Sequence, residues 1–313
     1  MSEKAPILLP PNKGGIAHAV QYLRDGKLVA LPTETVYGLA ARADREDAVA
    51  AIYRAKGRPA FNPLIVHVSG VEMAKGLAQV DARAEGLMQH FWPGPLTLVL
   101  PSLPSSPVVP AVTAGLDTIA LRMPAHALTR AVLSQLDYPL AAPSANRSMG
   151  ISPTASEHVL ASLDAGLAAV LDGGECERGL ESTIIALREG GGWSLLREGP
   201  ITAEELAQKL GSAPLEAGRG IEAPGQLVRH YSPGKPLRLN AQQAKADEFL
   251  IGFGPMDGDY NLSATGDLAQ AAARLYAALH LAASSANARI AIAPIPEAGI
   301  GAAINDRLKR AAS

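Results

Sequence analysis

The chain has 313 residues, which is enough for a large hydrophobic core and for two domains. Its formal net charge of −2 gives no overall basic field that would attract nucleic acid, so an RNA contact would have to be a local patch. The single Cys176 excludes an internal disulfide framework and a cysteine-based zinc site. We expect a cytoplasmic protein without a membrane span, because no long apolar run is present and the start MSEKAPILLP lacks the apolar centre of a signal peptide.

Predicted helices and strands alternate along the first 210 residues. A helix over 12–25 leads to a strand at 27–31, and a second helix begins at the N-cap Asp44 and ends at Gly57. Further strands are predicted at 64–68, 96–100, 118–121, 140–142, 168–171, 183–187 and 194–196, and further helices at 71–79, 81–91, 125–136, 154–163 and 202–210. Because some strands follow each other without a helix, the order predicts a mixed α/β sheet.

The composition changes near residue 211. Residues 211–236 are rich in glycine and proline, show no periodicity and contain the segment QLVRHYSP. An irregular segment of this length is either disordered or functional, and its Arg-His-Tyr cluster favours function. A smaller α/β pattern follows, with strands at 249–252 and 290–293, a helix capped by Asp267 and a last helix near 300–311. We therefore predict an N-terminal domain (1–210), a linker (211–236) and a C-terminal domain (237–313).

The block of residues 31–68 is the most informative part of the chain. Its loop LPTETVYGL carries hydroxyl groups, and the turn that follows the second predicted helix carries Lys56 and Arg58. A hydroxyl-rich loop and a basic turn together suit a small polar substrate that lies next to an anion. Two simpler explanations stay open at this point, because a helix C-terminus favours the two cations and turn formation alone favours Thr33 and Thr35.

Two later segments place polar side chains at the ends of predicted strands. Arg122 follows the strand at 118–121, where a guanidinium suits a bidentate grip on a carboxylate or phosphate, or a surface ion pair. In APSAN (142–146) the small residues allow a ligand close to the backbone, and Ser144 and Asn146 offer polar groups. Ser152 either joins this set or caps the next helix, and we expect Thr154 to cap that helix.

The fourth polar segment contains Ser182, which enters an apolar strand, and Arg197, which ends the next one. The carboxylates of Asp172, Glu175 and Glu181 are more typical of turns and ion pairs than of a metal site, because Mg²⁺ on a nucleotide needs few protein carboxylates.

No covalent mechanism is indicated by the sequence. The seven histidines are scattered, Cys176 has no evident histidine partner, and no phosphate-binding glycine motif follows a strand. His67 lies in a predicted apolar strand, where it is either a core histidine or a residue of the site.

The polar segments, in this order, resemble the YrdC-like family of threonylcarbamoyl-AMP synthases. The matching motifs are PTETVYGL (32–39), KGRP (56–59), NPLIVHV (62–68), WPGPLT (92–97), LRMPAH (121–126), APSAN (142–146), ESTI (181–184) and LREGP (196–200). HYSPGKP (230–236) and GIGAAINDRLKRAA (299–312) are similar to the long form, which has an extra C-terminal domain. The resemblance implies an α/β fold with a twisted, open mixed sheet, a concave and positively lined cleft, and a smaller Rossmann-like α/β C-terminal domain.

The resemblance also implies an activity. Members of this family are nucleotidyltransferases that condense L-threonine, bicarbonate or CO₂ and ATP into threonylcarbamoyl-AMP and pyrophosphate. A tRNA-modifying transferase complex later places the threonylcarbamoyl group on the adenosine 3′ of the anticodon in tRNAs that read ANN codons. We expect Mg²⁺ to accompany ATP, and we expect the linker to cover the active site, because a cover would exclude water from labile intermediates.

Individual roles follow from the resemblance, position by position. The expected threonine pocket consists of Thr33, Arg122, Ala142 and Ser182, together with His67. The expected ATP contacts are Lys56, Arg58, Thr118, Ser144, Asn146, Ser152, Arg197, His230 and Tyr231. Lys56 and Arg58 are the expected catalytic residues, because they would stabilise the leaving pyrophosphate, and no residue is expected to bind the metal directly.

Two other functions stay open on the sequence. A double-stranded RNA or tRNA-binding module would use the same basic surface, although the net charge and the 4% aromatic content count against it as the main role. A weak tRNA contact is compatible with catalysis. A carbamoyltransferase that uses carbamoyl phosphate ranks lower, because the chain lacks the additional domains and zinc-finger cysteine pairs of the larger proteins with a YrdC-like domain.

Overall fold

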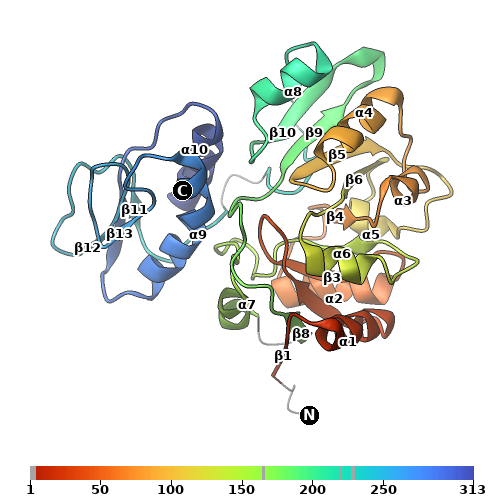
Figure 1. Ribbon diagram of the computed structural model, residues 1–313, viewed down its shortest axis with the longest axis horizontal. Helices are drawn as coiled ribbons and strands as arrows, with labels where there is room; N and C mark the ends of the chain where they lie inside the picture. Colours follow the sequence, from red (N-terminus) through yellow and green to blue (C-terminus); the bar gives the residue numbers. More distant parts are fainter. Residues whose placement is uncertain (1–4, 164–165, 217, 219, 227–229) are drawn as a thin grey trace.

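The computed structural model describes residues 5–163, 166–216, 218, 220–226 and 230–313, and it shows a large N-terminal α/β unit beside a small C-terminal one (Figure 1). Residues 1–4 of the start segment and residues 227–229 of QLVRHYSP lie outside the described residues. Among the described residues, no helix is both long and apolar enough to cross a membrane.

The large unit is built on a ten-stranded sheet in the order β1-β8-β2-β3-β7-β4-β6-β5-β9-β10. Its strands are β1 (Ile7–Leu9), β2 (Leu28–Leu31), β3 (Gly38–Arg42), β4 (Ile65–His67), β5 (Leu96–Pro101), β6 (Thr118–Arg122), β7 (Leu140–Ala141), β8 (Leu167–Leu171), β9 (Thr183–Leu187) and β10 (Trp193–Arg197). Parallel pairs such as β4 with β6 occur beside antiparallel pairs such as β5 with β6. The predicted mixed α/β sheet is therefore confirmed.

Helices cover the two faces of this sheet unequally. The helices of the large unit are α1 (Lys13–Arg24), α2 (Glu46–Lys56), α3 (Val71–Lys75), α4 (Ala82–Phe91), α5 (Pro110–Thr113), α6 (Ala127–Leu133), α7 (Ser156–Ser162) and α8 (Ala203–Leu210), with a short 3₁₀ turn at Glu189–Gly191. On one face, α2, α4, α5, α7 and α8 contribute to the main core with residues from strands across the sheet. On the other face, α1 and α6 pack only over the half that contains β8, β2, β3 and β7.

Over the remaining half of that second face, the part of the chain that the structure describes places no helix. Its apolar side chains come from β4, β6, β5, β9 and β10, and the residue that packs on them is Ala223, from the segment between the two units. Strand alternation puts His67 and Arg122 on the same face, at the ends of β4 and β6. This half-open face is where the polar segments of the sequence come together.

The C-terminal unit has its own four-stranded sheet in the order β11-β14-β12-β13, with every pair parallel. Its strands are β11 (Leu237–Arg238), β12 (Glu248–Gly252), β13 (Tyr260–Asn261) and β14 (Arg289–Ile292), and its helices are α9 (Leu268–Ser284) and α10 (Ile300–Ala311). Both helices lie on the side of the small sheet that faces the large unit (Figure 1). The predicted smaller α/β unit is present.

Three local predictions were wrong. Asp44 does not cap α2; it forms an ion pair with Arg42, and the N-cap is Arg45. Gly38 and Leu39, which end the predicted loop LPTETVYGL, belong to strand β3. Thr154 does not cap α7, whose N-cap is Ala155.

Candidate active site

A cavity on the half-open face collects most of the polar residues that the sequence analysis singled out. The predicted site residues that line it are Thr33, Arg58, His67, Arg122, Ala142, Ser144, Arg197, His230 and Tyr231. They come from loops and strand ends that are up to about 200 positions apart in the chain, so the fold alone brings them together. The sequence analysis assigned no site role to Thr35, Glu181 or Gly225, which also line this cavity.

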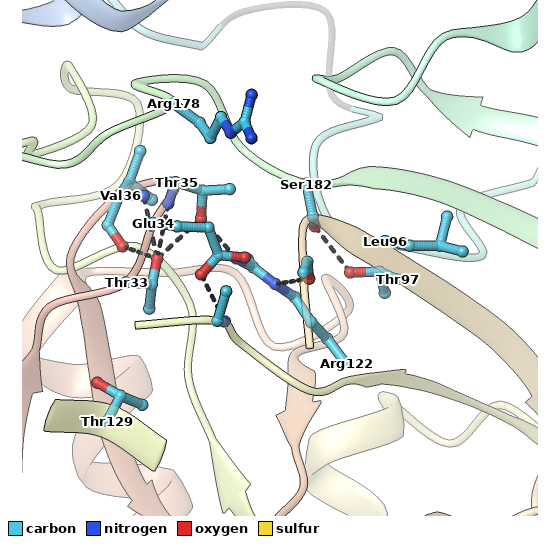
Figure 2. Close-up of polar contacts among 12 residues, drawn as sticks. Thr33, Glu34, Thr35, Val36, Leu96, Thr97, Arg122, Thr129, Arg178 and Ser182 are labelled. Carbon is cyan, nitrogen blue, oxygen red and sulfur yellow. Dashed lines mark hydrogen bonds and ion pairs between the residues drawn. The ribbon is translucent and has the colours of Figure 1, made fainter. Parts of the chain in front are cut away.

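The hydroxyl-rich loop is held closed by its own side chain. The Thr33 hydroxyl donates to the carbonyl oxygen of Val36 at 2.6 Å and accepts from the amides of Thr35 and Val36 at 3.2 Å (Figure 2). Both explanations offered for Thr33 therefore apply: the side chain shapes the turn and also lines the cavity.

A buried ion pair joins this loop to strand β6. Arg122 Nη2 donates to Glu34 Oε1 at 2.7 Å and to Thr35 Oγ1 at 2.9 Å, and the two charged side chains point at each other in Figure 2. Both side chains are almost fully buried. Burial opposes ionisation of Glu34, but Arg122 and the amide of Ala125 outweigh it and lower the pKa of this carboxyl. The guanidinium is thus fixed in place at the cavity wall.

Glu34 is a residue that sequence reasoning missed. It stands between two threonines in PTETVYGL, and a charged residue inside an otherwise uncharged, buried segment was the available signal. Arg178, from the same motif region as Glu181, points away from the Glu34–Arg122 pair (Figure 2). Its side chain is half exposed, so it adds no buried charge to the cavity.

The two cations of the basic turn, Lys56 and Arg58, have different roles. The C-cap Gly57 adopts a left-handed conformation with φ of 60°, which ends α2 between the two cations. Arg58 lines the cavity and donates to the carbonyl oxygens of Asn62 and Pro63. Lys56 is buried, and its Nζ donates to the carbonyl oxygens of Ser144, at 2.6 Å, and of Asn146.

Lys56 therefore ties the helix end to the Ser-x-Asn loop, and it is not among the residues that line the cavity. Asn146 also stays behind the lining, where its Oδ1 accepts from the Ser144 hydroxyl at 2.6 Å. Burial lowers the pKa of Lys56 well below its usual value, with Arg58 adding to the effect, and burial lowers the pKa of Arg58 to about 10.

Ser182 and Arg197 form a second hydroxyl–cation pair. The Ser182 hydroxyl lies 2.7 Å from that of Thr97 (Figure 2). Arg197 donates from Nη2 to the same hydroxyl and from Nε to the Ser182 carbonyl oxygen, both at 3.0 Å. Ser182 lies behind the cavity wall, and it orients Arg197, whose pKa is lowered to about 10 by burial.

Thr118 and Ser152 are not brought to the cavity lining. Thr118 shares a face of β6 with Arg122 but lies four residues away, about 13 Å along the strand. Ala120 lies between them and packs against Ala223. Ser152 donates its hydroxyl proton to Glu181, which itself lines the cavity.

The segment between the units also contributes to the cavity lining. His230 and Tyr231 line it together with Pro224 and Gly225. Among the described residues, His230 Nδ1 is buried without a hydrogen-bond partner. Burial lowers the pKa of His230 to about 3, so its imidazole is neutral at physiological pH.

The described residues contain no group of three or more His, Cys, Asp or Glu side chains that could hold a metal ion. Asp172 accepts from the Gly174 amide, as expected for a turn residue, and Glu181 is in an ion pair with Arg307. The donors at the cavity are mainly hydroxyl groups and guanidinium groups. This set fits a Mg²⁺ ion that is carried by nucleotide phosphates and water.

Comparisons with known proteins show the family to which the chain belongs. A family model named for Sua5, YciO and YrdC and described as Telomere recombination matches residues 21–199. A second model, described as Threonylcarbamoyl-AMP synthase, C-terminal domain, matches residues 201–313. The chain belongs to the YrdC-like family of threonylcarbamoyl-AMP synthases, in the long form with the extra C-terminal domain.

Individual relatives match over nearly the whole chain. Threonylcarbamoyl-AMP synthase from Bacillus subtilis is 38% identical over 97% of this chain and 94% of its own length. The protein of the same name from Pyrococcus abyssi is 40% identical over 94% of this chain and 92% of its own length. The crystal structure of P. abyssi Sua5 complexed with L-threonine has a TM-score of 0.90 at 35% identity, and the match covers 99% of this chain and 98% of that chain.

Proposed function

We propose that this protein condenses L-threonine, bicarbonate or CO₂ and ATP into threonylcarbamoyl-AMP and pyrophosphate. It is an enzyme of the nucleotidyltransferase type, and its product serves the threonylcarbamoyl modification of the adenosine 3′ of the anticodon in tRNAs that read ANN codons. The observation that carries the proposal is one cavity in which a fixed guanidinium, Arg122, lies beside hydroxyl groups and near two further arginines, the half-buried Arg58 and the buried Arg197.

The threonine half of the site is the part around Arg122. Its guanidinium is held by Glu34 and Thr35, and we assign it to the carboxylate of the amino acid. His67 pairs with Arg122 in the strand register, and burial, followed by the Arg122 charge, lowers its pKa to about 3. We therefore assign His67 to the substrate as a neutral imidazole, beside Thr33 and Ala142, with Ser182 supporting the pocket wall.

The triphosphate half is the part around Arg58, Ser144 and Arg197. No salt bridge joins Arg58 or Arg197 to a carboxylate among the described residues, so these two charges are available to an anion at the cavity. We assign Arg58 and Arg197 to the phosphates, and Lys56 to the Ser-x-Asn loop that it holds. Thr118 and Ser152 stay proposed nucleotide contacts, and His230 and Tyr231 are proposed to contact ATP from the linker.

The chemistry needs positioning and charge neutralisation. The threonine amine attacks the carbon of CO₂ and loses a proton to give a carbamate. A carbamate oxygen then attacks the α-phosphorus of ATP, and the bond to the bridging oxygen breaks to release pyrophosphate. Mg²⁺ bound by the phosphates would reduce their charge, and Arg58 and Arg197 would stabilise the charge that develops on the leaving group.

We propose three parts for the chain: a catalytic domain (1–210), a linker that covers the active site (211–236), and a Rossmann-like C-terminal domain (237–313). Ala223 is fully buried on the apolar part of the open face, in the same cluster as Ala120 of β6. A nucleotide that reaches Thr118 has to displace this segment, and the segment then excludes water from the carbamate and the adenylate.

The proposed setting is the cytoplasm, with a tRNA-modifying transferase complex as the consumer of the adenylate. The alternative of a double-stranded RNA or tRNA-binding module is disfavoured by burial. Lys56, Arg122 and Arg197 are at most 6% exposed, whereas RNA phosphates require cations on an accessible surface. A weak tRNA contact stays a prediction.

The experiment that tests the proposed function follows pyrophosphate release with ATP and Mg²⁺ in the presence and absence of L-threonine and bicarbonate. We expect release only when both are present. Release that is independent of threonine and bicarbonate, or no release with all components, would contradict the proposal.

A further inference from the structure

One contact of the C-terminal unit with the cavity is made at a carboxylate, that of Glu181. Glu181 lines the cavity next to Arg197, and it belongs to the large unit. Its oxygens accept from Tyr276 of α9 at 2.9 and 3.0 Å and from Arg307 Nε of α10 at 2.9 Å. Ser152, from the large unit, is the remaining donor.

Arg307 is buried and has several hydrogen-bond partners, unlike an arginine in a surface ion pair. Its side chain is 0% exposed, and its Nη2 also donates to the carbonyl oxygen of Glu198 at 2.8 Å. Its guanidinium lies over the ring of Tyr231, 5.4 Å from the centroid. Removing a guanidinium from water costs free energy, and hydrogen bonds and opposite charges have to offset this cost. The several partners of Arg307 are therefore what allows it to be buried.

The Glu181–Arg307 pair affects the charge around Arg197. Arg197 is the other cation that acts on Glu181, since burial alone would raise the pKa of this carboxyl but Arg307 and Arg197 lower it to about 2. Glu181 is therefore ionised at neutral pH, and its charge is shared between two arginines. Arg307 hydrogen-bonds it directly, whereas Arg197 hydrogen-bonds Ser182.

We infer that Arg307 is a positioning residue for the proposed synthase reaction: its guanidinium, which also pairs with Asp306 through Nη1, holds the Glu181 carboxylate through Nε, so that Arg197 keeps its charge and orientation for the triphosphate. The inference rests on the proposed function. It gives the C-terminal unit a part in ATP binding that is distinct from covering the cavity. Without Arg307, Glu181 would turn to Arg197, compete with the phosphates and pull the guanidinium away from Ser182.

The test compares four forms of the full-length protein: wild type, Arg307→Met, Arg307→Lys and the double variant Glu181→Gln with Arg307→Met. Lys309→Met on the same helix is the matched control, because Lys309 is exposed and pairs with Glu297 at the surface. KM for ATP and kcat are measured by threonine-dependent pyrophosphate release. Binding of an ATP analogue with a methylene group between the α- and β-phosphorus atoms is measured by calorimetry, and thermal unfolding reports on the fold.

We expect Arg307→Met to raise KM for ATP and Kd for the analogue about 10- to 100-fold, the range for a lost hydrogen bond to a charged group. Arg307→Lys keeps the charge and should lie closer to wild type, and Lys309→Met should match wild type. The double variant removes both charges, so it should recover most of the lost analogue affinity. A docking role alone predicts no recovery, because the double variant also lacks the contact between the units.

An Arg307→Met variant with unchanged analogue affinity, or a double variant as weak as Arg307→Met, would overturn the inference. If Arg307→Met does not fold, the comparison of Arg307→Lys with the double variant decides in the same way. Failure of the proposed function is separate, since it would appear in the wild type as pyrophosphate release that does not depend on threonine, while the analogue still reports on the charges.

Discussion

Two buried ion pairs set the charge of the cavity. Glu34 pairs with Arg122, and Glu181 pairs with Arg307. Each pair occupies a carboxylate that would otherwise repel phosphate or neutralise a neighbouring cation. The cavity-lining cations without a carboxylate ion pair among the described residues are Arg58 and Arg197, and they lie at the part of the cavity that we assign to the triphosphate.

The Glu34–Arg122 pair gives a prediction about stability. Glu34→Gln should lower the free energy of unfolding by about 3–5 kcal/mol, because it leaves Arg122 buried without a counter-charge. It should also raise KM for threonine, because Arg122 loses its fixed orientation. Urea unfolding and threonine titration measure the two effects.

The matched control is Glu85→Gln in the partly exposed Lys75–Glu85 pair, which has nearly the same geometry at 2.9 Å. It should change the free energy of unfolding by less than about 1 kcal/mol. An equal decrease in the free energy of unfolding in the two variants would contradict the claim that burial makes the Glu34–Arg122 pair more stabilising than a surface pair.

Arg58 gives a prediction about catalysis. Arg58→Ala should cost about 3–4 kcal/mol of transition-state stabilisation, as for other lost electrostatic donors, and it should appear in kcat/KM for ATP. The control is Arg54→Ala, one turn earlier on α2, where the side chain is exposed. A similar loss of kcat/KM in both variants would contradict the assignment of Arg58 to the triphosphate.

Single residues were predictable where a local pattern marks them. Arg122 leaves the end of an apolar run, so its place at the mouth of a cavity followed from the sequence. The partner of Arg122 is 88 positions earlier in the chain, and no local pattern connects Glu34 to it. Arg307 was hidden for the same reason, since its carboxylate partner is 126 positions away.

At the scale of elements, the end of α2 positions both cations of the basic turn. Gly57 has φ of 60°, which a residue with a Cβ adopts only with strain. The turn directs Lys56 to the Ser-x-Asn loop and Arg58 to the cavity. The predicted helix stop at Gly57 is confirmed, because a left-handed glycine after a helical pattern is a local signal.

We therefore expect Gly57→Ala to destabilise the protein by about 1 kcal/mol and to raise KM for ATP, because Arg58 follows directly in the chain. Gly86→Ala, inside α4, should instead stabilise it by up to about 1 kcal/mol, because the position is helical and a Cβ there meets no atom within 4 Å. The midpoints of urea unfolding measure these opposite changes in stability. Destabilisation by both substitutions would contradict this account of Gly57.

Strand β3 shows where element prediction fails. Its sequence GLAAR contains small residues of low strand propensity, and it follows directly on a turn. It is a strand because β2 and β7 pair with it on both sides. That environment is created by residues up to a hundred positions away, so the local sequence does not reveal it.

At the scale of the whole molecule, the core of the C-terminal unit extends to the cavity, because it includes Val36 and Tyr231 of the cavity lining. The large sheet leaves half of one face without a helix, and the segment between the units fills that space with Ala223. The sequence predicted a mixed sheet and a smaller second unit, but the strand order follows from long-range pairing that no window of sequence contains.

Buried histidines give the whole protein a pH dependence. The pKa values of His67 and His230 are lowered to about 3, mainly because burial disfavours the imidazolium form. The unfolded chain therefore binds more protons between about pH 3 and 6.5, and stability is complete above pH 6.5 and falls as the pH decreases. Each histidine contributes a slope of up to about 1.4 kcal/mol per pH unit in this window.

His67→Gln should reduce that slope, as measured by the free energy of unfolding in urea between pH 7 and pH 4.5. The exposed His18→Gln on α1 is the control and should leave the slope as it is. An unchanged slope in His67→Gln would mean that this imidazole is not held neutral by burial.

The most direct test of the central claim is the mass of the nucleotide product formed from ATP, L-threonine, Mg²⁺ and isotopically labelled bicarbonate. We predict an adenylate that contains both threonine and the labelled carbon, formed together with pyrophosphate. Threonyl-adenylate without the label, or ADP as the nucleotide product, would contradict the assignment of the cavity to a carbamate that attacks the α-phosphorus.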